Sequence, residues 1–372
     1  MTMAAFTPPP YPYERLGGVR ALAALHEGGV IDCSIGTPCD PPPPAVLTAL
    51  AESGTERGYP TSAGSDALLG AAAGWIERRF GVEVPDGALA ACVGTKELVA
   101  SVVHHLHLRQ PDRSIVLYPE VSYPTYAMGA QLAGLTAVAV PMVGGRLDLA
   151  TISPELAASA LVLWSNSPSN PTGELDDLAA AAAWGRTHDV LVLSDECYTE
   201  FTWATAPQTI LSAGLSGVLA VHSLSKRSNL AGLRVGFYAG DPEVVRYLRS
   251  VRQHAGMMVP GPVQAAAVEA LNDDLHVEAQ RGRYLDRLEI IARGLRADGY
   301  DASVPEGTFY LWVPIRSDQA DAWAAAEELA SRSGLLVSPG DLYGPAGAGH
   351  FRVAVVQPDD RLELAMDRLA LR

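Results

Sequence analysis

Short apolar runs alternate with longer stretches of helical apolar spacing over most of the chain. The short runs are mostly apolar on both faces, which is typical of strands buried in a parallel sheet. The expected strands are Leu89–Val93, Ser114–Leu117, Thr136–Val140, Ala160–Trp164, Val190–Ser194, Gly217–His222 and Arg234–Tyr238. Helical patterns such as Thr95–Arg109 and Leu175–His188 separate them. The alternation predicts an α/β fold whose large domain is a doubly wound, mostly parallel sheet of these seven strands, with its ligand site at their carboxyl ends.

The pattern changes after about Pro262, where a long helical stretch runs towards Asp298. The elements expected beyond it are strands at Ala302–Val304, Tyr310–Val313 and Phe351–Val356, a helix at Gln319–Ser333, a glycine-rich loop at Ser338–Gly349 and a final helix. They predict a small α+β domain. We place an N-terminal arm and part of the small domain in residues 1–45, the large domain in 46–294 and the C-terminal small domain in 295–372, with the proline run Pro41–Pro44 marking the first passage.

The charge balance is acidic, with 27 Lys and Arg against 42 Asp and Glu and a formal net charge of −15. This balance argues against a nucleic-acid or anionic-membrane partner, although a few local cations can still hold a small anion. Hydrophobic residues make up 48% and charged residues 19%, as in packed globular proteins. The longest uncharged stretch, Val121–Gly145, is broken by prolines and glycines, so no membrane span is expected.

The four cysteines, Cys33, Cys39, Cys92 and Cys197, show no C-x-x-C spacing. We therefore expect reduced thiols and a cytoplasmic location. The histidines His104, His105 and His107 have no carboxylate or cysteine at ligand spacing, so we expect no metal site.

One segment, H-S-L-S-K-R-S-N-L-A-G-L-R-V-G from His222, carries a lysine just after an expected strand. Ser223 and Ser225 flank Lys226, and Arg234 follows eight residues later. A lysine there can form a Schiff base when burial or nearby positive charge lowers its pKa, and hydroxyls with an arginine can hold a phosphate. A surface turn with a solvated lysine fits this segment equally well when it is taken alone.

Further polar residues follow other strand ends. In L-V-L-S-D-E-C-Y, Asp195 can pair with a protonated ring nitrogen and Tyr198 can bind a phenolic oxygen, although Asp195 also fits a plain helix cap. Asn170 lies in N-S-P-S-N-P-T-G, a sharp turn after a strand. Gly94 and Thr95 open a helix whose N-terminus can bind an anion.

Two cationic residues complete the motifs. Lys96 adds positive charge beside the Gly94–Thr95 turn. Arg352, in F-R-V-A-V-V, is a natural bidentate partner for a carboxylate, although a surface arginine is the plainer reading of this strand.

Together and in this order, the segments resemble the class I/II aminotransferases of fold type I, which depend on pyridoxal phosphate, over nearly the whole chain. The resemblance implies that Lys226 forms the Schiff base and moves the proton, and that Asp195 pairs with the pyridine nitrogen. It implies that Tyr198 and Asn170 bind the phenolic oxygen. The positions that it assigns to the phosphate are Gly94, Thr95, Ser223 and Arg234. Ser225 and Lys96 are further cofactor-binding candidates, and the role of Lys96 stays open because that position varies among these enzymes.

The resemblance also covers the substrate and a second subunit. Tyr123, in V-S-Y-P-T-Y, matches the aromatic residue that stacks on the cofactor ring. Gly36, Asn170 and Arg352 match positions that bind the substrate α-carboxylate. Tyr59, in R-G-Y-P-T-S-A-G, matches the tyrosine that reaches the phosphate of a neighbouring subunit, which implies a homodimer with shared active sites.

The resemblance leaves the reaction open between an aminotransferase and a C–S β-lyase of the same fold. V-G-T-K-E-L and P-E-G-T-F-Y-L-W resemble actinobacterial N-succinyldiaminopimelate aminotransferases, which implies transfer between N-succinyl-LL-diaminopimelate and 2-oxoglutarate in lysine biosynthesis. Aspartate or another amino acid remains an alternative. Binding the distal carboxylates of this substrate requires cations, for which Lys96, Arg20 and Arg227 are candidates. The N-terminal arm and the Ser338–Gly349 loop are expected to close over the substrate.

Ser223-Leu-Ser-Lys226 also fits the S-x-x-K signature of serine acyl-enzymes. That chemistry further needs S-D-N and K-T-G segments, which the sequence lacks. P-loop and dinucleotide fingerprints are absent as well. These comparisons favour the aldehyde cofactor over acyl transfer or nucleotide chemistry.

Overall fold

The computed structural model describes residues 6–371, so residues 1–5 of the predicted arm and residue 372 lie outside the described residues. Its centre is one seven-stranded sheet in the order β2-β10-β9-β8-β7-β3-β4. The strands are β2 (Leu89–Cys92), β3 (Ile115–Pro119), β4 (Thr136–Val140), β7 (Ala160–Asn166), β8 (Leu191–Asp195), β9 (Val218–Ser223) and β10 (Gly236–Gly240). Only β10 is antiparallel to its neighbours. All seven expected strands are confirmed, with ends shifted by a few residues.

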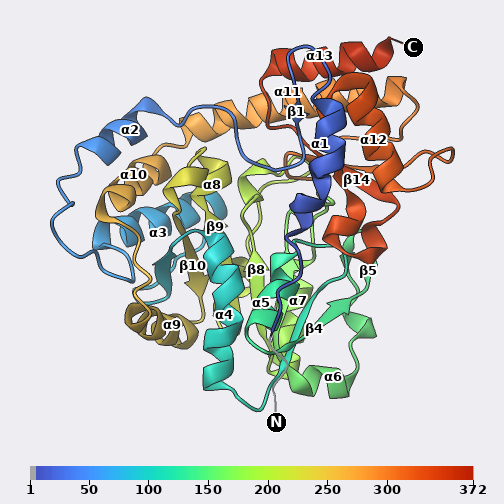
Figure 1. Ribbon diagram of the computed structural model, residues 1–372. Helices are drawn as coiled ribbons and strands as arrows, with labels where there is room; N and C mark the ends of the chain where they lie inside the picture. The colour runs from blue at the N-terminus through green and yellow to red at the C-terminus, as the bar shows by residue number, and fades with distance from the viewer. Residues whose placement is uncertain (1–5, 372) are drawn as a thin grey trace.

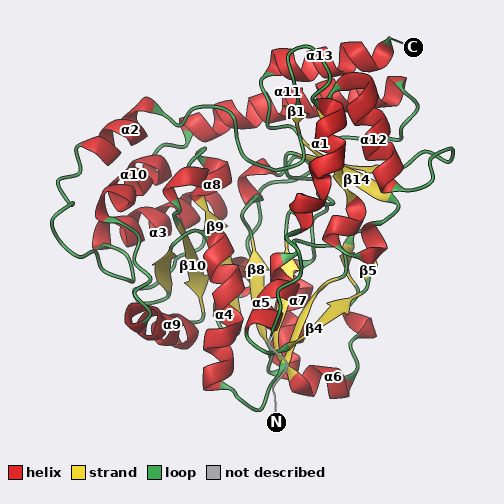
Figure 2. Ribbon diagram, viewed as in Figure 1, coloured by secondary structure: helices red, strands yellow, loops and turns green. Residues whose placement is uncertain are grey.

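Helices cover both faces of this sheet (Figures 1 and 2). One face packs on α4 (Thr95–Arg109), α5 (Thr125–Leu132) and α9 (Pro242–His254) through residues such as Leu193 and Tyr238. The other face packs on α3 (Asp66–Phe80), α7 (Leu178–His188) and α10 (Gly261–Asn272) through Val192 and Phe237. Successive strand residues thus enter opposite cores, which explains why these strands are apolar on both faces.

Shorter elements complete the large domain. They are α2 (Pro44–Ala51), α6 (Pro154–Ser159), α8 (Leu224–Arg227) and the hairpin β5 (Met142–Val143) with β6 (Arg146–Leu147). The expected helix from Leu175 begins only at Leu178, because the Asp177 side chain accepts a hydrogen bond from the Ala180 N–H and caps the helix there. Arg234, expected at the start of a strand, instead has φ 54° and precedes β10.

The C-terminal part forms a three-stranded antiparallel sheet in the order β11-β14-β13. Its strands and helices are β11 (Tyr310–Pro314), β13 (Ser338–Pro339), β14 (His350–Ala354), α11 (Leu275–Ala297), α12 (Ala322–Ser333) and α13 (Asp359–Ala370). β1 (Ile31–Asp32) pairs with β12 (Leu335–Leu336), and α1 (Gly17–Ala23) packs on α12. Figure 1 accordingly shows the blue N-terminal segment among the red C-terminal helices.

The expected strand at Ala302–Val304 is wrong, because residues 301–305 have no strand pairing. Ala302 is instead buried in the core shared by α11, α12 and α13, and its carbonyl accepts a hydrogen bond from Arg296 at 2.8 Å. A side-chain donor therefore takes the place of the strand N–H that would bind this carbonyl in a sheet.

The glycine-rich loop is packed rather than open. It contains β13 and two short turns, and a Cβ on Gly340 would lie 2.1 Å from the carbonyl oxygen of Gly347. Its closing over substrate and the division of the chain at residues 45 and 294 stay predictions. Among the described helices, none combines the length and apolar character needed to cross a bilayer.

Candidate active site

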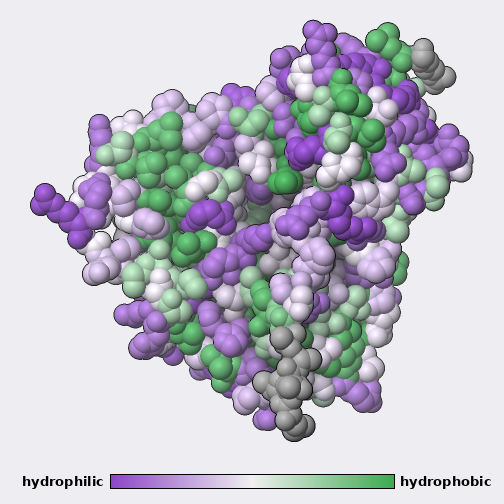
Figure 3. Space-filling model, viewed as in Figure 1, coloured by the Kyte–Doolittle hydropathy of each residue, from purple (hydrophilic) through white to green (hydrophobic). Residues whose placement is uncertain are grey.

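A cavity of about 460 Å³ lies at the carboxyl ends of β7, β8 and β9. On the molecular surface, Figure 3 shows a hollow between the lobe with α1, α12 and α13 and the rest of the protein. The predicted residues that line the cavity are Gly36, Thr95, Lys96, Tyr123, Asn170, Asp195, Tyr198, Ser223, Ser225, Lys226, Arg234 and Arg352. Gly94 precedes α4 beside the cavity, whereas Tyr59 is 99% exposed and lies away from it. The chain has only two lysines, Lys96 and Lys226, and the cavity contains both.

Asp195 ends β8 and presents a buried carboxylate to the cavity. The Tyr126 hydroxyl donates to its Oδ2 at 2.9 Å, and the Cys197 N–H donates to its Oδ1 at 3.2 Å. Burial raises the pKa of Asp195, and the hydrogen bonds from Cys197 and Tyr126 oppose the rise. A cationic ring nitrogen in the cavity would therefore find a desolvated carboxylate already held by two donors.

Lys226 follows β9 in the short helix α8 and is half-buried. Its Nζ donates to the carbonyl oxygen of Gly36. Burial lowers the pKa of Lys226 to about 8, Cys197 opposes this shift, and Arg352 and Arg234 reinforce it. An amine with this pKa is partly neutral near pH 8, as an attack on an aldehyde requires.

The N-terminus of α4 and Arg234 form a cradle for an anion. Gly94 precedes α4 with φ 73° and ψ 146°, a conformation nearly restricted to glycine. A Cβ at Gly94 would lie 2.2 Å from Nη2 of Arg234, so the missing side chain admits the guanidinium. Ser223 faces the same cavity, and its Oγ accepts a hydrogen bond from the Ser225 N–H at 3.1 Å. The cradle combines a helix N-terminus, hydroxyls and an arginine, which suits a phosphate.

Arg352 lies on β14 and is only 1% exposed. Its Nη1 donates to Asn170 Oδ1 and its Nη2 donates to the Ser34 carbonyl, both at 2.6 Å. Its guanidinium also lies 4.0 Å from the centroid of the Tyr310 ring. Its buried Nε has no hydrogen-bond partner among the described residues. The arginine therefore presents a fixed donor plane to the cavity, which fits a carboxylate.

Gly36 is required by a close approach of Tyr310, because a Cβ there would lie 2.0 Å from the Tyr310 hydroxyl. That hydroxyl shares a hydrogen bond of 2.8 Å with the hydroxyl of Tyr198. The predicted site residues include Gly36 and Tyr198 but not Tyr310, because residues so distant along the chain show no common spacing.

The sequence reasoning also missed residues that position Asp195. Asn166 ends β7, and its side chain donates to the Asp195 carbonyl at 2.8 Å and accepts from the Asn170 N–H at 2.7 Å. Tyr126 stacks on Trp164 with ring centroids 4.8 Å apart. Asn166 and Tyr126 both lie inside motifs described above. The signal that could have identified them was a polar group at the end of a strand or at the start of a helix.

Tyr11 and Tyr13 of the arm also line the cavity. Lys96 Nζ donates to the Tyr11 hydroxyl at 3.0 Å and lies 4.6 Å from the centroid of its ring. Tyr13 and Tyr343 share a hydrogen bond of 3.1 Å between their hydroxyls. The arm is thus fastened beside the cavity by both the large domain and the glycine-rich loop, and no periodicity in its proline-rich sequence predicted this.

Of the three cations considered for a distal substrate group, only Lys96 lines the cavity. Arg227 is buried and forms ion pairs with Glu200 and Asp274 at 3.2 Å. Arg20 is paired with Asp32 at 2.5 Å. The candidacies of Arg20 and Arg227 are therefore wrong, because carboxylates of the chain already engage them away from the cavity.

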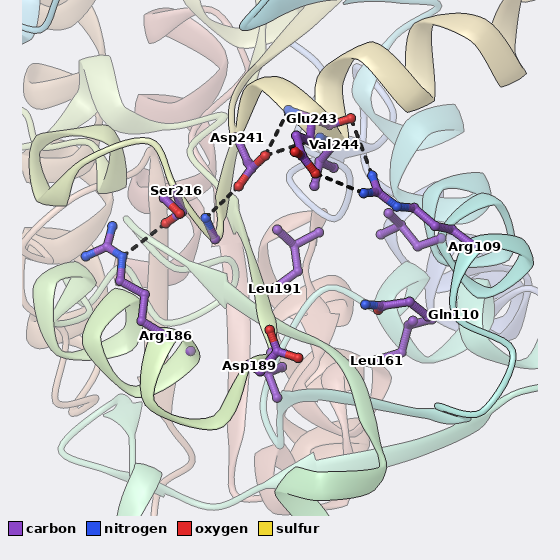
Figure 4. Close-up of a pocket in the computed structure, with 14 residues that line it drawn as sticks. Arg109, Gln110, Leu161, Arg186, Asp189, Leu191, Ser216, Asp241, Glu243 and Val244 are labelled. Atoms are coloured by element: carbon purple, nitrogen blue, oxygen red, sulfur yellow. Dashed lines mark hydrogen bonds and ion pairs between the residues drawn. The ribbon is translucent and has the colours of Figure 1, made fainter.

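A second cavity, of about 350 Å³, lies at the opposite, amino ends of the strands (Figure 4). There Arg109 pairs with Glu243 at 3.2 Å, and Arg186 donates to the Ser216 carbonyl at 3.0 Å. Asp241 accepts from the Gly217 N–H at 3.0 Å. These charged groups form ion pairs and hydrogen bonds with one another and with the backbone. We therefore take the first cavity, and not this one, as the candidate reaction site.

Comparisons with known proteins agree with this geometry. The family model described as aminotransferase class I and II matches residues 29–369. Probable aminotransferase Rv1178 of Mycobacterium tuberculosis is 42% identical, over 97% of this chain and 85% of that protein. 4-dedimethylamino-4-oxo-anhydrotetracycline transaminase OxyQ of Streptomyces rimosus is 40% identical, over 97% and 99%.

Among solved structures, a probable N-succinyldiaminopimelate aminotransferase from Thermus thermophilus aligns with a TM-score of 0.86 and 30% identity, over 96% of this chain and 99% of that one. This match confirms the expected fold of type I. Together with the carboxylate, the amine and the phosphate cradle in one cavity, these relationships establish that the chain belongs to the class I and II aminotransferases, enzymes that depend on pyridoxal phosphate.

Proposed function

We propose that this aminotransferase exchanges an amino group between N-succinyl-LL-diaminopimelate and 2-oxoglutarate, with Lys226 as its catalytic amine. The observation that carries the reaction type is the single cavity that contains Lys226, Asp195 and Arg352. The lowered pKa of Lys226, the buried carboxylate of Asp195 and the unpartnered Nε of Arg352 all suit a bound cofactor and an amino acid.

Pyridoxal phosphate, when bound, supplies the electron sink for a carbanion at the substrate Cα. In the proposal, Asp195 keeps the ring nitrogen protonated, and Tyr198 and Asn170 donate to the phenolic oxygen. Tyr123, a half-buried cavity residue, stacks on the ring. The residues assigned to the phosphate are Gly94, Thr95, Ser223 and Arg234, and Ser225 and Lys96 line the same cavity.

Lys226 has two tasks in this proposal. Its Nζ would hold the cofactor covalently, and once the substrate amine had displaced it, it would be the neutral base that takes a proton from the substrate Cα and the acid that returns it. The Gly36 carbonyl accepts a hydrogen bond from Nζ and so orients it. Arg352 and Arg234 lower the pKa of Lys226, so the same cations that bind anions also favour its neutral form.

Arg352, Asn170 and the backbone at Gly36 bind the substrate α-carboxylate. The two terminal nitrogens of Arg352 already hold Asn170 and Ser34, so the side chain is fixed before substrate arrives. A fixed guanidinium loses less entropy on binding than a free one. This arrangement supports a common α-carboxylate subsite for the amino donor and the oxo-acid acceptor.

The proposal includes a homodimer in which Tyr59 enters the neighbouring active site. The Tyr59 side chain is 99% exposed, and Leu47 of α2 is 46% exposed. Figure 3 shows hydrophobic side chains gathered over α2 and α10. Exposed aromatic and aliphatic groups of this kind suit a subunit contact. A cytoplasmic location is part of the same proposal and rests on the four cysteines, which are all free.

Two observations favour the diaminopimelate substrate. The Thermus thermophilus neighbour carries that name as a probable activity, and Lys96 in the cavity is held by a tyrosine rather than by a carboxylate. A distal anionic group can therefore compete for Lys96. OxyQ instead acts on an oxo-anhydrotetracycline according to its name. Six tyrosines line the cavity, and among them Tyr11, Tyr13, Tyr123 and Tyr310 suit an aromatic polycycle. That amination is the second candidate.

The test is a panel of amino donors with 2-oxoglutarate, in which glutamate formation is measured. The proposal expects N-succinyl-LL-diaminopimelate to exceed aspartate, tyrosine, alanine and LL-diaminopimelate by at least tenfold in kcat/KM. Equal turnover of a plain amino acid overturns it. Preferred amination of a polycyclic ketone from glutamate supports the second candidate, and release of pyruvate and ammonia from a cysteine conjugate identifies a β-lyase.

A further inference from the structure

A second pair of titratable side chains is buried behind the cofactor site. Glu196 follows Asp195, and His222 precedes Ser223, so each is the chain neighbour of a cavity residue. Glu196 is 1% exposed and His222 is 2% exposed. Glu196 Oε2 lies 3.5 Å from His222 Nε2. Nothing in the proposed reaction uses either group.

The strand register explains why these two residues meet. Asp195 of β8 is paired with Val221 of β9, and the Glu196 N–H continues the ladder by donating to the Val221 carbonyl at 2.9 Å. Because successive side chains alternate along a strand, Asp195 and Ser223 face the cavity while Glu196 and His222 lie on the other side. The pair therefore joins the same two strand ends that carry Asp195 and Ser223.

The donors around Glu196 distinguish its two oxygens. Oε1 accepts from the Ser194 hydroxyl and from the Ile210 N–H, both at 2.8 Å. Oε2 receives no hydrogen bond from the described residues, and neither ring nitrogen of His222 has a hydrogen-bond partner among them. Oε1, which accepts two hydrogen bonds, therefore fits the carbonyl oxygen of a protonated carboxyl group. Oε2, which faces only a ring nitrogen, fits its O–H donor.

The surroundings also favour a neutral pair. Aromatic rings enclose His222, with the centroid of Trp75 at 5.0 Å and that of Phe237 at 5.1 Å. The neighbouring cations are already engaged, since Arg227 and Arg79 both pair with Glu200. Burial raises the pKa of Glu196 to about 7, hydrogen bonds from Ile210, Thr209 and Ser194 oppose this rise, and the charge of Asp195 adds to it. Burial lowers the pKa of His222 to about 3.

Little room remains for solvent to change this arrangement. The cavity among Trp75, Glu196 and His222 has a volume of only about 10 Å³. This is the lower limit for one water molecule. Glu196 Oε2 and His222 Nε2 therefore have mainly each other as polar partners.

We propose that Glu196 is a positioning residue that is protonated at Oε2 and donates a hydrogen bond to Nε2 of a neutral His222. This hydrogen bond holds the ends of β8 and β9 together, so that Asp195 is positioned to bind the ring nitrogen and Ser223 to bind the phosphate. This inference rests on the proposed roles of Asp195 and Ser223. A neutral carboxyl also spares Asp195 a second negative charge nearby. It should therefore be replaceable by an amide but not by a truncated side chain.

The first test uses the protein without cofactor and so does not depend on the proposed function. An infrared difference spectrum between wild type and Glu196→Gln at pH 6 should contain the C=O stretch of a protonated carboxyl group. A difference spectrum with only carboxylate bands overturns the proposal.

The second test measures the affinity for pyridoxal phosphate. Glu196→Gln should stay within threefold of wild type, because an amide N–H can replace the O–H donor, whereas Glu196→Ala should bind about tenfold more weakly, as is usual when an outer support of a bound group is removed. Leu369→Ala, on the buried face of α13, is the matched control for a loss of stability and should leave this affinity unchanged. Equal affinities for wild type and Glu196→Ala, or a Gln variant as weak as the Ala variant, overturn the proposal.

These outcomes are separable from the function itself. If wild type forms no covalent linkage with pyridoxal phosphate, the proposed role of Lys226 fails, while the infrared result still tests the Glu196–His222 pair. If Glu196→Ala does not fold, the comparison of Glu196→Gln with wild type and the infrared spectrum still decide the question.

Discussion

The cradle at Gly94 gives the sharpest quantitative prediction. Gly94→Ala places a Cβ 2.2 Å from Nη2 and 2.6 Å from Cζ of Arg234, so the guanidinium must move. The new residue must also adopt φ 73° and ψ 146°. Backbone strain of this kind costs about 1–3 kcal/mol in stability. Loss of one hydrogen bond to a charged group costs about 1.5–3 kcal/mol in binding.

The expected result is a ten- to hundredfold weaker affinity for pyridoxal phosphate, since about 1.4 kcal/mol corresponds to a factor of ten. The affinity is measured by titrating cofactor-free protein and following the absorbance of the bound cofactor. Arg234→Ala should weaken binding similarly, and adding Gly94→Ala to it should have little further effect, because both changes remove the same contact.

Gly214→Ala is the matched control for backbone strain. Gly214 has φ 94° and ψ 155°, which is close to the conformation of Gly94. A Cβ there meets Nη2 of Arg186 at an ordinary 3.5 Å, far from the cofactor site. Gly214→Ala should lower Tm while keeping cofactor affinity. If Gly94→Ala binds cofactor as tightly as Gly214→Ala does, the role given to this cradle is wrong.

Three further predictions concern the cavity. Asp195→Asn should reduce kcat/KM at saturating cofactor by about a hundredfold or more, or ~3 kcal/mol, as for other preorganised charges, and wild-type kinetics would contradict the assignment. Arg352→Lys should raise KM for both amino donor and oxo acid by at least tenfold while cofactor affinity holds, because an ammonium cannot replace a bidentate guanidinium; an unchanged KM refutes this. Burial lowers the pKa of Lys226 from 10.5 to about 8, so the folded protein releases this proton before the unfolded chain does, and the free energy of unfolding of cofactor-free protein should rise between about pH 8 and 10.5. Lys226→Met should remove that rise, and an identical pH profile in the variant would show that Lys226 is not the group.

Much of the site was predictable because it sits at strand ends. Parallel strands bring their carboxyl ends to one edge of the sheet, so the polar residues after β8 and β9, Asp195 and Lys226, had to lie close together. The motif order then allowed the phosphate and carboxylate positions to be assigned through the resemblance. Local spacing and strand order were sufficient for these residues.

Contacts made by irregular or distant segments were not predictable. Tyr11 reaches Lys96 from a proline-rich arm without periodicity, and Tyr310 fits against Gly36 although the two residues are far apart in the sequence. Arg227 is one of the predicted candidates for a substrate cation, but its side chain forms an ion pair with Glu200. Sequence neighbours on α8 thus lie in different environments, which only the packed fold determines.

The short strands show the same limit. β1 and β12 have two residues each, too few for an alternating pattern, and they pair where α1 packs on α12. Ala302 was apolar enough to suggest a strand, but its carbonyl is satisfied by Arg296. In both cases tertiary contacts, rather than local pattern, determine whether backbone groups join a sheet.

The central claim is that the cofactor is bound covalently by Lys226. Lys96 and Lys226 are the only two lysines in the sequence. Borohydride reduces the imine in the protein loaded with pyridoxal phosphate, and peptide mass mapping then shows which of the two lysines carries the cofactor. The account predicts a reduced pyridoxyl group on Lys226 and none on Lys96. A colourless protein that takes up no label, or a label on Lys96 alone, would contradict it.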